Sequence, residues 1–253
     1  MRAISLQSGS SGNCIYIESG GVRLLFDAGI CGSQAEKRLA ACGRDIRQVD
    51  AVIISHDHAD HISHAGVYQR KYGLPIYVTP RTLSSAERNF RLGRLTDVHL
   101  FMAGGDIRFG EVSVRTIPTP HDGSDGSVFV VRAGKKRLGI MTDVGHVFEE
   151  LRREMADLDA VFIESNYDPE MLKTGPYPAF LKKRIKGPKG HISNLESAEL
   201  LLSGSRLKWA CLAHLSENNN TVGLALGTHR RVLGTGLKLY AAGRRSATGI
   251  LSL

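Results

Sequence analysis

The chain of 253 residues is 42% hydrophobic and 23% charged, which is ordinary for a soluble globular protein. No apolar run approaches the roughly 20 residues needed to cross a bilayer, which excludes a membrane-spanning helix. The N-terminus turns polar and glycine-rich at once, and the four cysteines lack the spacing of a disulfide framework or a metal site. We therefore expect a cytoplasmic protein without a signal peptide, folded as one domain over residues 1–253.

The net charge of +8 is unevenly distributed along the chain. Residues 171–190 and 218–253 together contain eleven lysines and arginines and no acidic residue, so the rest of the chain is net −3 (22 basic against 25 acidic residues). A basic C-terminal portion predicts a polyanionic partner such as nucleic acid. A solvated basic surface without a partner explains the charge equally well.

Taken in order, the first half of the chain alternates between strand and helix patterns. Short apolar runs predict strands at 2–6, 15–18, 22–26, 49–54 and 75–79. Gly20-Gly21 lies between two of these runs and indicates a hairpin. Ser33 and Glu36 have the spacing of a capping box, and helices are predicted at 34–42, 62–72 and 82–92.

The second half shows the same alternation of predicted strands and helices, and the boundary between the two βα halves lies near residues 97–120. Strands are predicted at 98–101, 111–117, 127–133, 137–142, 159–164, 208–213 and 237–241. Helices are predicted at 147–156, at 194–203 after a Ser193/Glu196 capping box, and at 221–233. Residues 166–190 contain four prolines and are predicted to be mainly loop. Because helices alternate with strands throughout, we predict an α/β sandwich with helices covering the sheet faces.

A dense group of histidines and aspartates follows the predicted strand 49–54. It contains three histidines and two aspartates in the pattern Ser55-His56-Asp57-His58-Ala59-Asp60-His61. Extended backbone has a period of two, so His56 and His58 point to the same side, and Asp60 and His61 approach after a turn. Imidazole and carboxylate ligands suit Zn²⁺, Mn²⁺ or Fe, with Zn²⁺ favoured here. A merely solvated polar loop does not account for this grouping.

Further metal-ligand candidates follow other apolar strands. His121 comes after the run 112–117, Asp143 after 138–142, and His214 after 209–213. Each residue on its own is typical of an ordinary loop. Together, each at the end of a strand and accompanied by the H-x-H-x-D-H pattern, they indicate a binuclear metal centre, because several strands must converge to build one.

With these residues in place, the sequence resembles the metallo-β-lactamase superfamily over nearly its whole length. It is most similar to the YycJ/WalJ subfamily, described as 5′→3′ DNA exonucleases, through Ser8-Gly9-Ser10-Ser11-Gly12-Asn13, Glu164-Ser165-Asn166, Tyr177-Pro178, Gly190-His191-x-Ser193-Asn194 and His214-Leu215-Ser216-Glu217-Asn218-Asn219. The subfamily usually has His where this chain has Tyr167, so the role of that side chain is not carried over. The implied fold is a four-layer αββα sandwich, in which two mixed sheets are flanked by helices and carry two metal ions at one edge.

The resemblance also implies roles for individual residues. One ion is expected to bind His56, His58 and His121, the second Asp60, His61 and His214, and Asp143 is expected to bridge the two. Asp60 and His191 are the expected catalytic residues. In this interpretation His191 protonates the leaving 3′-oxygen, and the alternative is that it only caps or packs beside the helix that follows Ser193.

The expected substrate contacts lie in two loops. Residues 8–13 can form an anion-binding nest of backbone N–H groups, although a plain hairpin connection is an equally good interpretation. In this loop the resemblance implies phosphate contacts from Ser10, Ser11 and Asn13. In the basic segment 171–190 the candidates are Lys182, Lys183 and Arg184.

Three functions compete at this point. The favoured one is a binuclear metal-dependent nuclease, a 5′→3′ DNA exonuclease that attacks the phosphodiester with a metal-bridging hydroxide. The second is a small-molecule hydrolase on the same fold, such as a glyoxalase II-like thioesterase or a lactonase. The third is a non-catalytic nucleic-acid-binding protein, which the complete set of ligands disfavours. The basic C-terminal portion favours nucleic acid over a small molecule, and DNA is preferred to RNA.

Overall fold

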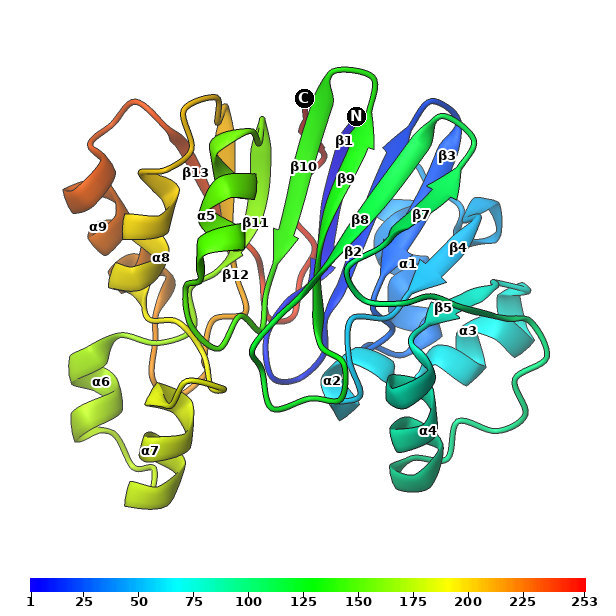
Figure 1. Ribbon diagram of the computed structural model, residues 1–253, viewed down its shortest axis with the longest axis horizontal. Coiled ribbons are helices and arrows are strands. Elements are labelled where there is room, and N and C mark those ends of the chain that lie inside the picture. Colours follow the sequence, from blue (N-terminus) through cyan, green and yellow to red (C-terminus); the bar gives the residue numbers. More distant parts are fainter.

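The computed structural model describes residues 1–253 and consists of two seven-stranded β-sheets that pack face to face, with helices on both outer faces (Figure 1). The predicted α/β class and the αββα layering are therefore confirmed. Buried apolar side chains of the two sheets meet in one central interface, and the two chain termini lie at the same end of the molecule.

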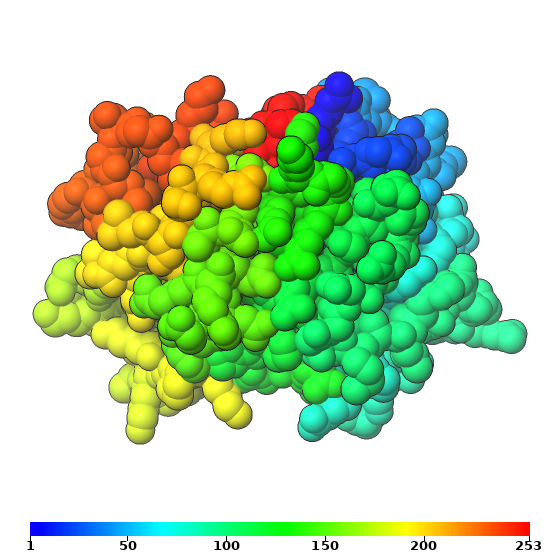
Figure 2. Space-filling model, turned by 45° about the horizontal axis from the view of Figure 1, so that its top comes forward, coloured from blue at the N-terminus to red at the C-terminus, as the bar shows by residue number.

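The first sheet is built by the N-terminal half and one C-terminal strand. Its strands, in order across the sheet, are β14 (Leu251–Ser252), β1 (Arg2–Gln7), β2 (Cys14–Ser19), β3 (Val22–Phe26), β4 (Ala51–Ile53), β5 (Ile76–Val78) and β6 (Val98–Leu100). The pairs from β14 to β3 are antiparallel, and those from β3 to β6 are parallel. Figure 2 shows the last residues of the chain beside the first, as the pairing of β14 with β1 requires.

The second sheet is built by the C-terminal half. Its strands, in order across the sheet, are β13 (Lys238–Ala241), β12 (Trp209–Ala213), β11 (Ala160–Glu164), β10 (Lys136–Met141), β9 (Ser127–Ala133), β8 (Val112–Pro118) and β7 (Asp106–Phe109). The pairs from β10 to β13 are parallel, and those from β10 to β7 are antiparallel. Every residue of β11 and β12 is buried, as expected for parallel strands covered on both faces.

Helices cover the outer faces and the strand ends. They are α1 (Gly32–Ala41), the short 3₁₀ helix η1 (Ile46–Gln48), α2 (Ala59–Ile62), α3 (Ala65–Tyr72), α4 (Pro80–Asn89), α5 (Glu149–Ala156), α6 (Pro169–Thr174), α7 (Ala179–Lys186), α8 (Asn194–Leu201) and α9 (Val222–Leu233). None of these helices has the length and apolar character needed to cross a membrane.

Three apolar clusters hold the layers together. The central one, between the sheets, contains Phe26, Phe129, Phe162 and Trp209. A second cluster packs the first sheet against α1 and α3, and a third packs the second sheet against α5, α8 and α9. Burial of apolar area is worth about 25 cal/mol per Å², so these clusters supply the main driving force for folding and fix the strand ends in space.

Some predicted elements are wrong in detail. Residues 62–72 are not one helix, because the chain turns at Ser63 and His64 between α2 and α3. Residues 166–190 are not mainly loop but contain α6 and α7. Asp168 caps α6 by accepting hydrogen bonds from the amides of Glu170 and Met171, and Pro169 occupies the first turn, where proline is tolerated. The short edge strands β7 and β14 were not predicted.

The two predicted capping boxes have opposite outcomes. The box at α8 is confirmed, since Ser193 Oγ accepts from the amide of Glu196 at 3.3 Å and Glu196 Oε2 accepts from the amide of Ser193 at 2.8 Å. The box at α1 is wrong, because the N-cap is Cys31 and has no side-chain cap. Glu36 is instead held by tertiary partners, Arg47 at 2.9 Å and Lys71 at 3.0 Å.

An ionic network at Glu18 ties β2 to the turn after α1, and it generates a prediction about stability. Glu18 accepts from Arg44 Nη2 at 2.6 Å, from Tyr16 at 2.8 Å and from Arg2 at 3.2 Å. Burial opposes ionisation, but the hydrogen bonds from Arg44, Tyr16 and Arg2 outweigh it and lower the pKa of Glu18 to about 2. The ionised Glu18 carboxylate therefore stabilises the folded state. This stabilisation is complete above the ordinary glutamate pKa of 4.5 and is lost as pH falls towards 2.

We expect Glu18→Gln to lower the free energy of unfolding at pH 7 by about 1–2 kcal/mol, since charged hydrogen bonds are lost from a partly solvated site. The difference from wild type, measured by urea denaturation, should shrink between pH 4.5 and pH 2. A difference that stays constant across this range would show that Glu18 contributes packing rather than charge.

Candidate metal centre

The seven predicted metal-ligand residues converge at one edge of the sandwich, where strands of both sheets end. His56 and His58 follow β4, and Asp60 and His61 lie in the short helix α2. From the second sheet come His121 after β8, Asp143 after β10 and His214 after β12. This edge lies away from the two chain termini, at the end of the molecule where α2 is labelled in Figure 1.

Potential ligand atoms form overlapping groups at this edge, in each of which the atoms lie within 4.8 Å of one another. One group is His56, His58 and His121, and another is Asp60, His61 and His214. Asp143 lies between them, with Oδ2 at 3.3 Å from His61 Nε2 and Oδ1 at 3.6 Å from His121 Nε2. The structure thus brings together the two triplets and the shared aspartate that the sequence predicts.

Three buried polar atoms of this cluster have no hydrogen-bond partner in the protein. They are His56 Nε2, Asp143 Oδ2 and His214 Nε2. Leaving a buried donor or acceptor unsatisfied costs free energy, so nearly all such atoms in folded proteins have a partner. Lone pairs of imidazole and carboxylate that meet at one point are the donor set of a divalent transition metal, so the residues present fit such an ion.

Each of the five predicted histidine ligands has one ring nitrogen that faces away from the centre. This nitrogen contacts a neighbouring polar atom. The pairs are His56 Nδ1 with Ser55 Oγ at 2.9 Å, His58 Nε2 with Asp122 Oδ1 at 3.3 Å, His61 Nδ1 with Asp27 Oδ2 at 2.8 Å, His121 Nδ1 with Gly190 O at 2.9 Å and His214 Nδ1 with Glu164 Oε1 at 3.0 Å. Such contacts fix the ring orientation and the tautomer of a metal-binding histidine.

The sequence analysis gave no role to three acidic residues among these neighbours, although it quoted Glu164 in a motif of the subfamily. Asp27 and Glu164 each lie at the end of an apolar strand, which is the signal that found His121, Asp143 and His214. Glu164 is fully buried, and its Oε2 also accepts from the amides of Val144 at 3.1 Å and Ile192 at 3.2 Å. Asp122, directly after His121, had no comparable signal.

Left-handed backbone places several of these side chains. Asp27, Asp143 and His214 have φ of 65°, 57° and 54° at the ends of β3, β10 and β12. This conformation costs a non-glycine residue roughly 1–2 kcal/mol, so it persists only where the surroundings fix it. Thr119 Oγ1 donates to the carbonyl of Asp143 at 3.0 Å, and the amide of His214 donates to Ser8 Oγ at 2.8 Å.

The electrostatic environment differs between the two halves of the cluster, and around His61 and His214 it favours cations. Burial alone would lower the pKa of His61, but the carboxylates of Asp143, Asp27 and Asp60 outweigh burial and raise that pKa well above 6.5. Burial also opposes protonation of His214, yet Asp143 and its other acidic neighbours raise its pKa to about 10. The surroundings of His61 and His214 therefore attract positive charge, and a metal ion competes with protons for these lone pairs. Around His56 and His58 the balance is reversed, because burial and then the neighbouring histidines lower the pKa of both rings.

The remaining site candidates lie around this centre. His191 Nδ1 donates to Glu164 Oε1 at 2.8 Å, and the same nitrogen is 3.8 Å from Asp143 Oδ1. Asn13 is buried, with Nδ2 at 3.2 Å from Asp60 Oδ2 and 3.0 Å from His61 Nε2. Ser10 and Ser11 are exposed at the tip of the same loop.

The basic residues predicted to contact substrate lie on α7. Lys183 and Arg184 are exposed, and Lys182 Nζ donates to the carbonyl of Lys173 at 2.8 Å. Arg184 Nε donates to Asp122 Oδ2 at 2.6 Å, and the other oxygen of Asp122 faces His58. Helix α7 is thus connected to the cluster through one carboxylate.

Tyr167, the position at which this chain departs from the subfamily pattern, lies in an apolar group and makes no side-chain hydrogen bond to the predicted ligands. It is buried in a small apolar group with Leu172 and Ile185. Burial first, and then the charges of Glu196 and Glu164, raise the pKa of its phenol to about 12, so the side chain stays neutral. Its role is packing beneath α6 and α7.

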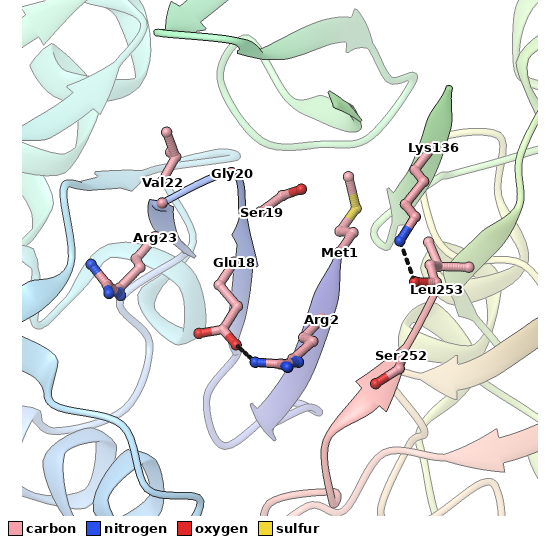
Figure 3. A pocket seen from close by; sticks show the side chains of 11 residues that line it. Met1, Arg2, Glu18, Ser19, Gly20, Val22, Arg23, Lys136, Ser252 and Leu253 are labelled. Carbon is pink, nitrogen blue, oxygen red and sulfur yellow. Dashed lines mark hydrogen bonds and ion pairs between the residues drawn. The ribbon is translucent and has the colours of Figure 1, made fainter. Parts of the chain in front are cut away.

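A cavity of about 570 Å³ lies at the opposite ends of the strands (Figure 3). It is lined by the Gly20-Gly21 turn, the start of β3 at Val22 and the start of β10 at Lys136. Arg2 is paired with Glu18, and Lys136 Nζ with the Leu253 carbonyl oxygen (Figure 3). None of its lining residues belongs to the histidine–aspartate cluster, so the cavity and the cluster are separate features.

Comparison with known proteins agrees with this architecture. Residues 22–214 match the family described as Beta-lactamase superfamily domain. Together with the two-sheet sandwich and the histidine–aspartate cluster, this match shows that the chain belongs to the metallo-β-lactamase superfamily.

Within the superfamily, the chain is 35% identical to exodeoxyribonuclease WalJ of Streptococcus pneumoniae serotype 2 (strain D39 / NCTC 7466), covering 87% of this chain and 83% of WalJ. It is 34% identical to exodeoxyribonuclease YycJ of Bacillus anthracis, covering 90% of this chain and 87% of YycJ.

Solved structures share the fold at low sequence identity. The metallo-β-lactamase fold protein YhfI of Bacillus subtilis superposes with a TM-score of 0.77 at 17% identity, covering 99% of this chain and 98% of YhfI. Zn²⁺-bound PqqB of Methylobacterium extorquens superposes with a TM-score of 0.75 at 16% identity, covering all of both chains.

The buried carboxylate of Glu164 generates a prediction about metal affinity. In Glu164→Gln, the amide oxygen can still accept from the amides of Val144 and Ile192, but the –NH₂ group then faces His214 Nδ1. The His214 proton must move to Nε2, which removes the lone pair that faces the centre. We expect metal affinity to fall about 10- to 100-fold, measured by competition with a chromogenic chelator. The control is the exposed Glu199→Gln, and unchanged affinity in Glu164→Gln would refute the tautomer argument.

Proposed function

We propose that this protein is a metal-dependent exodeoxyribonuclease that degrades DNA in the 5′→3′ direction. The observation that carries the proposal is 35% identity, over 87% of the chain, to a protein named exodeoxyribonuclease. The cluster of histidines and carboxylates supports it by supplying a donor set for divalent ions. The unpaired cysteines are compatible with a cytoplasmic location.

The proposed ligands follow the two triplets at the strand ends. His56, His58 and His121 would hold one ion, Asp60, His61 and His214 would hold a second, and Asp143 would be shared. Zn²⁺ is favoured by the number of imidazole donors, and Mn²⁺ and Fe are the alternatives. A pair of divalent ions supplies Lewis acidity, which favours deprotonation of water near neutral pH and neutralises charge developing on phosphate.

His191 is the proposed proton donor to the leaving 3′-oxygen. Its Nδ1 is bonded to Glu164 Oε1, which leaves Nε2 to carry the transferred proton. The contact with the Glu164 carboxylate holds the orientation of the ring. The side chain of His191 is 19% exposed, more than that of His121 or His214, so it remains accessible to substrate.

The proposed substrate contacts are the exposed Ser10 and Ser11 and the basic side chains Lys182, Lys183 and Arg184 of α7. Asn13 is buried and bonded to Asp60, so its proposed role is to position the cluster and the loop around it. The absence of acidic residues from 171–190 supports an anionic substrate, because each phosphate neutralised by lysine or arginine releases condensed counterions.

The decisive experiment is digestion of end-labelled DNA and RNA by apoprotein to which single metals are added. We expect Zn²⁺ or Mn²⁺ to restore stepwise shortening of DNA from its 5′ end, with two ions per chain by elemental analysis. Asp143→Ala should abolish degradation and lower the metal content, because both ions lose a ligand. The control is Asp157→Ala, which removes an exposed carboxylate beyond α5. Fewer than one ion per metal-replete chain, or no cleavage of any polynucleotide, would contradict the proposal.

A second prediction concerns His191. His191→Ala should lower kcat on DNA about 10²- to 10⁴-fold while both metals are retained, because general-acid help is typically worth that much. The defect should shrink on a p-nitrophenyl phosphodiester, whose leaving group needs no proton. The control is His146→Ala, since His146 only bonds the Pro188 carbonyl. Equal losses on both substrates would exclude the acid role, and loss of metal would make His191 a ligand.

A further inference from the structure

Helix α7 exposes an aromatic side chain that nothing in the structure covers. Phe180 is 75% exposed, while Leu181 and Ile185 of the same helix pack inward onto Tyr167 and Leu172. Phe180 therefore presents a bare aromatic face to solvent on the helix that also exposes Lys183 and Arg184.

Phe180 is placed on the face of α7 that is connected to the metal centre. Arg184 follows Phe180 by four residues, so the two side chains lie on one helix face about 6 Å apart along the axis. Arg184 Nε bonds Asp122 Oδ2 at 2.6 Å, and Asp122 Oδ1 lies 3.3 Å from His58 Nε2. A group bound over Phe180 thus lies about one helical turn from this contact.

The segment that carries this face is fixed against the cluster by backbone contacts. The amide of Asp122 donates to the carbonyl of Lys189 at 3.1 Å, and His121 Nδ1 bonds the carbonyl of Gly190 at 2.9 Å. Gly190 is packed so tightly that an added Cβ would lie 2.1 Å from the carbonyl oxygen of Ile185. The distance between Phe180 and the centre is therefore set by rigid structure.

The geometry points to Phe180 as a stacking platform for an unpaired base of single-stranded DNA, with Lys183 against the adjoining phosphate. This inference rests on the proposed nuclease function and names the form of DNA that the site takes. Proteins commonly bind single-stranded DNA with aromatic side chains set among basic ones. The aromatic rings stack on the bases, and the basic side chains pair with the negatively charged phosphates. The six basic and no acidic residues of 171–190 favour a polyanion over an apolar protein partner. A paired end must fray before its base can occupy Phe180.

The test compares steady-state kinetics of the metal-loaded protein on 5′-labelled single-stranded and blunt duplex DNA. Phe180→Ala should raise KM for single strands about 5- to 150-fold, the range that corresponds to loss of one base–aromatic stack. Phe180→Trp should retain wild-type KM, whereas Phe180→Leu, which keeps apolar area but no aromatic face, should resemble Phe180→Ala. Leu202→Ala is the matched control, since Leu202 is 61% exposed at the far end of α8.

A substrate variant tests the same contact without changing the protein. Oligonucleotides with a single abasic site, moved one position at a time from the 5′ end, should show one position at which wild-type KM rises as in Phe180→Ala. At that position Phe180→Ala should cause no further loss. Lys183→Ala should weaken binding and reduce its salt dependence by about one phosphate, whereas Phe180→Ala should leave the salt dependence unchanged.

The outcomes separate this inference from the proposed function. If wild type degrades DNA but Phe180→Ala has unchanged KM, or no abasic position matters, the stacking platform is refuted and the nuclease proposal stands. If Phe180→Leu is as good as wild type, the contact is apolar and not aromatic stacking, which also overturns the inference. If wild type degrades no DNA with any metal, the nuclease proposal itself fails.

Discussion

Buried carboxylates at the strand ends are the constraint on which the rest of this structure depends. Asp143 and Glu164 are 3% and 0% exposed, and charges at that depth destabilise a fold unless they are paired. Histidine rings from both sheets provide the pairing, with His214 Nδ1 3.4 Å from Asp143 and 3.0 Å from Glu164. The pairing is incomplete for three atoms that face the centre, and this donor set fits a metal ion. The fold is thus built to hold negative charge around a cation.

Close backbone approach is the means by which the fold meets this constraint. An added Cβ at Gly29 would lie 1.7 Å from the carbonyl oxygen of Asp60, so only glycine lets the β3–α1 connection pass beside α2. An added Cβ at Gly145 would similarly lie 1.8 Å from the carbonyl oxygen of Pro120. The first contact places the end of β3 beside α2, and the second places the ends of β8 and β10 side by side. The left-handed residues Asp27 and Asp143 then turn their side chains to the cluster.

The layer architecture and the histidine–aspartate cluster could be predicted from the sequence, because their signals are local or repeated along the chain. The spacing from His56 to His61 is unusual within six residues, and apolar runs before His121, Asp143 and His214 place each of them at a strand end. Asp27 and Glu164 were missed because one acidic residue after a strand is common, and their partners lie 34 and 27–50 positions away in the chain. The failed capping box has the same cause, since tertiary partners captured Glu36.

The prolines of residues 166–190 show how a correct local observation can lead to a wrong element. They do break the chain, but two of them begin helices, Pro169 in the first turn of α6 and Pro178 as the N-cap of α7. The consequence is functional, because a loop would leave the basic residues mobile, whereas a helix orders them. Arg184 contacts Asp122, which in turn contacts His58, so one carboxylate joins α7 to a metal-ligand candidate. In the proposed nuclease, a substrate group held on α7 therefore stays at a constant distance from the metal centre, which is the positioning that phosphodiester hydrolysis requires.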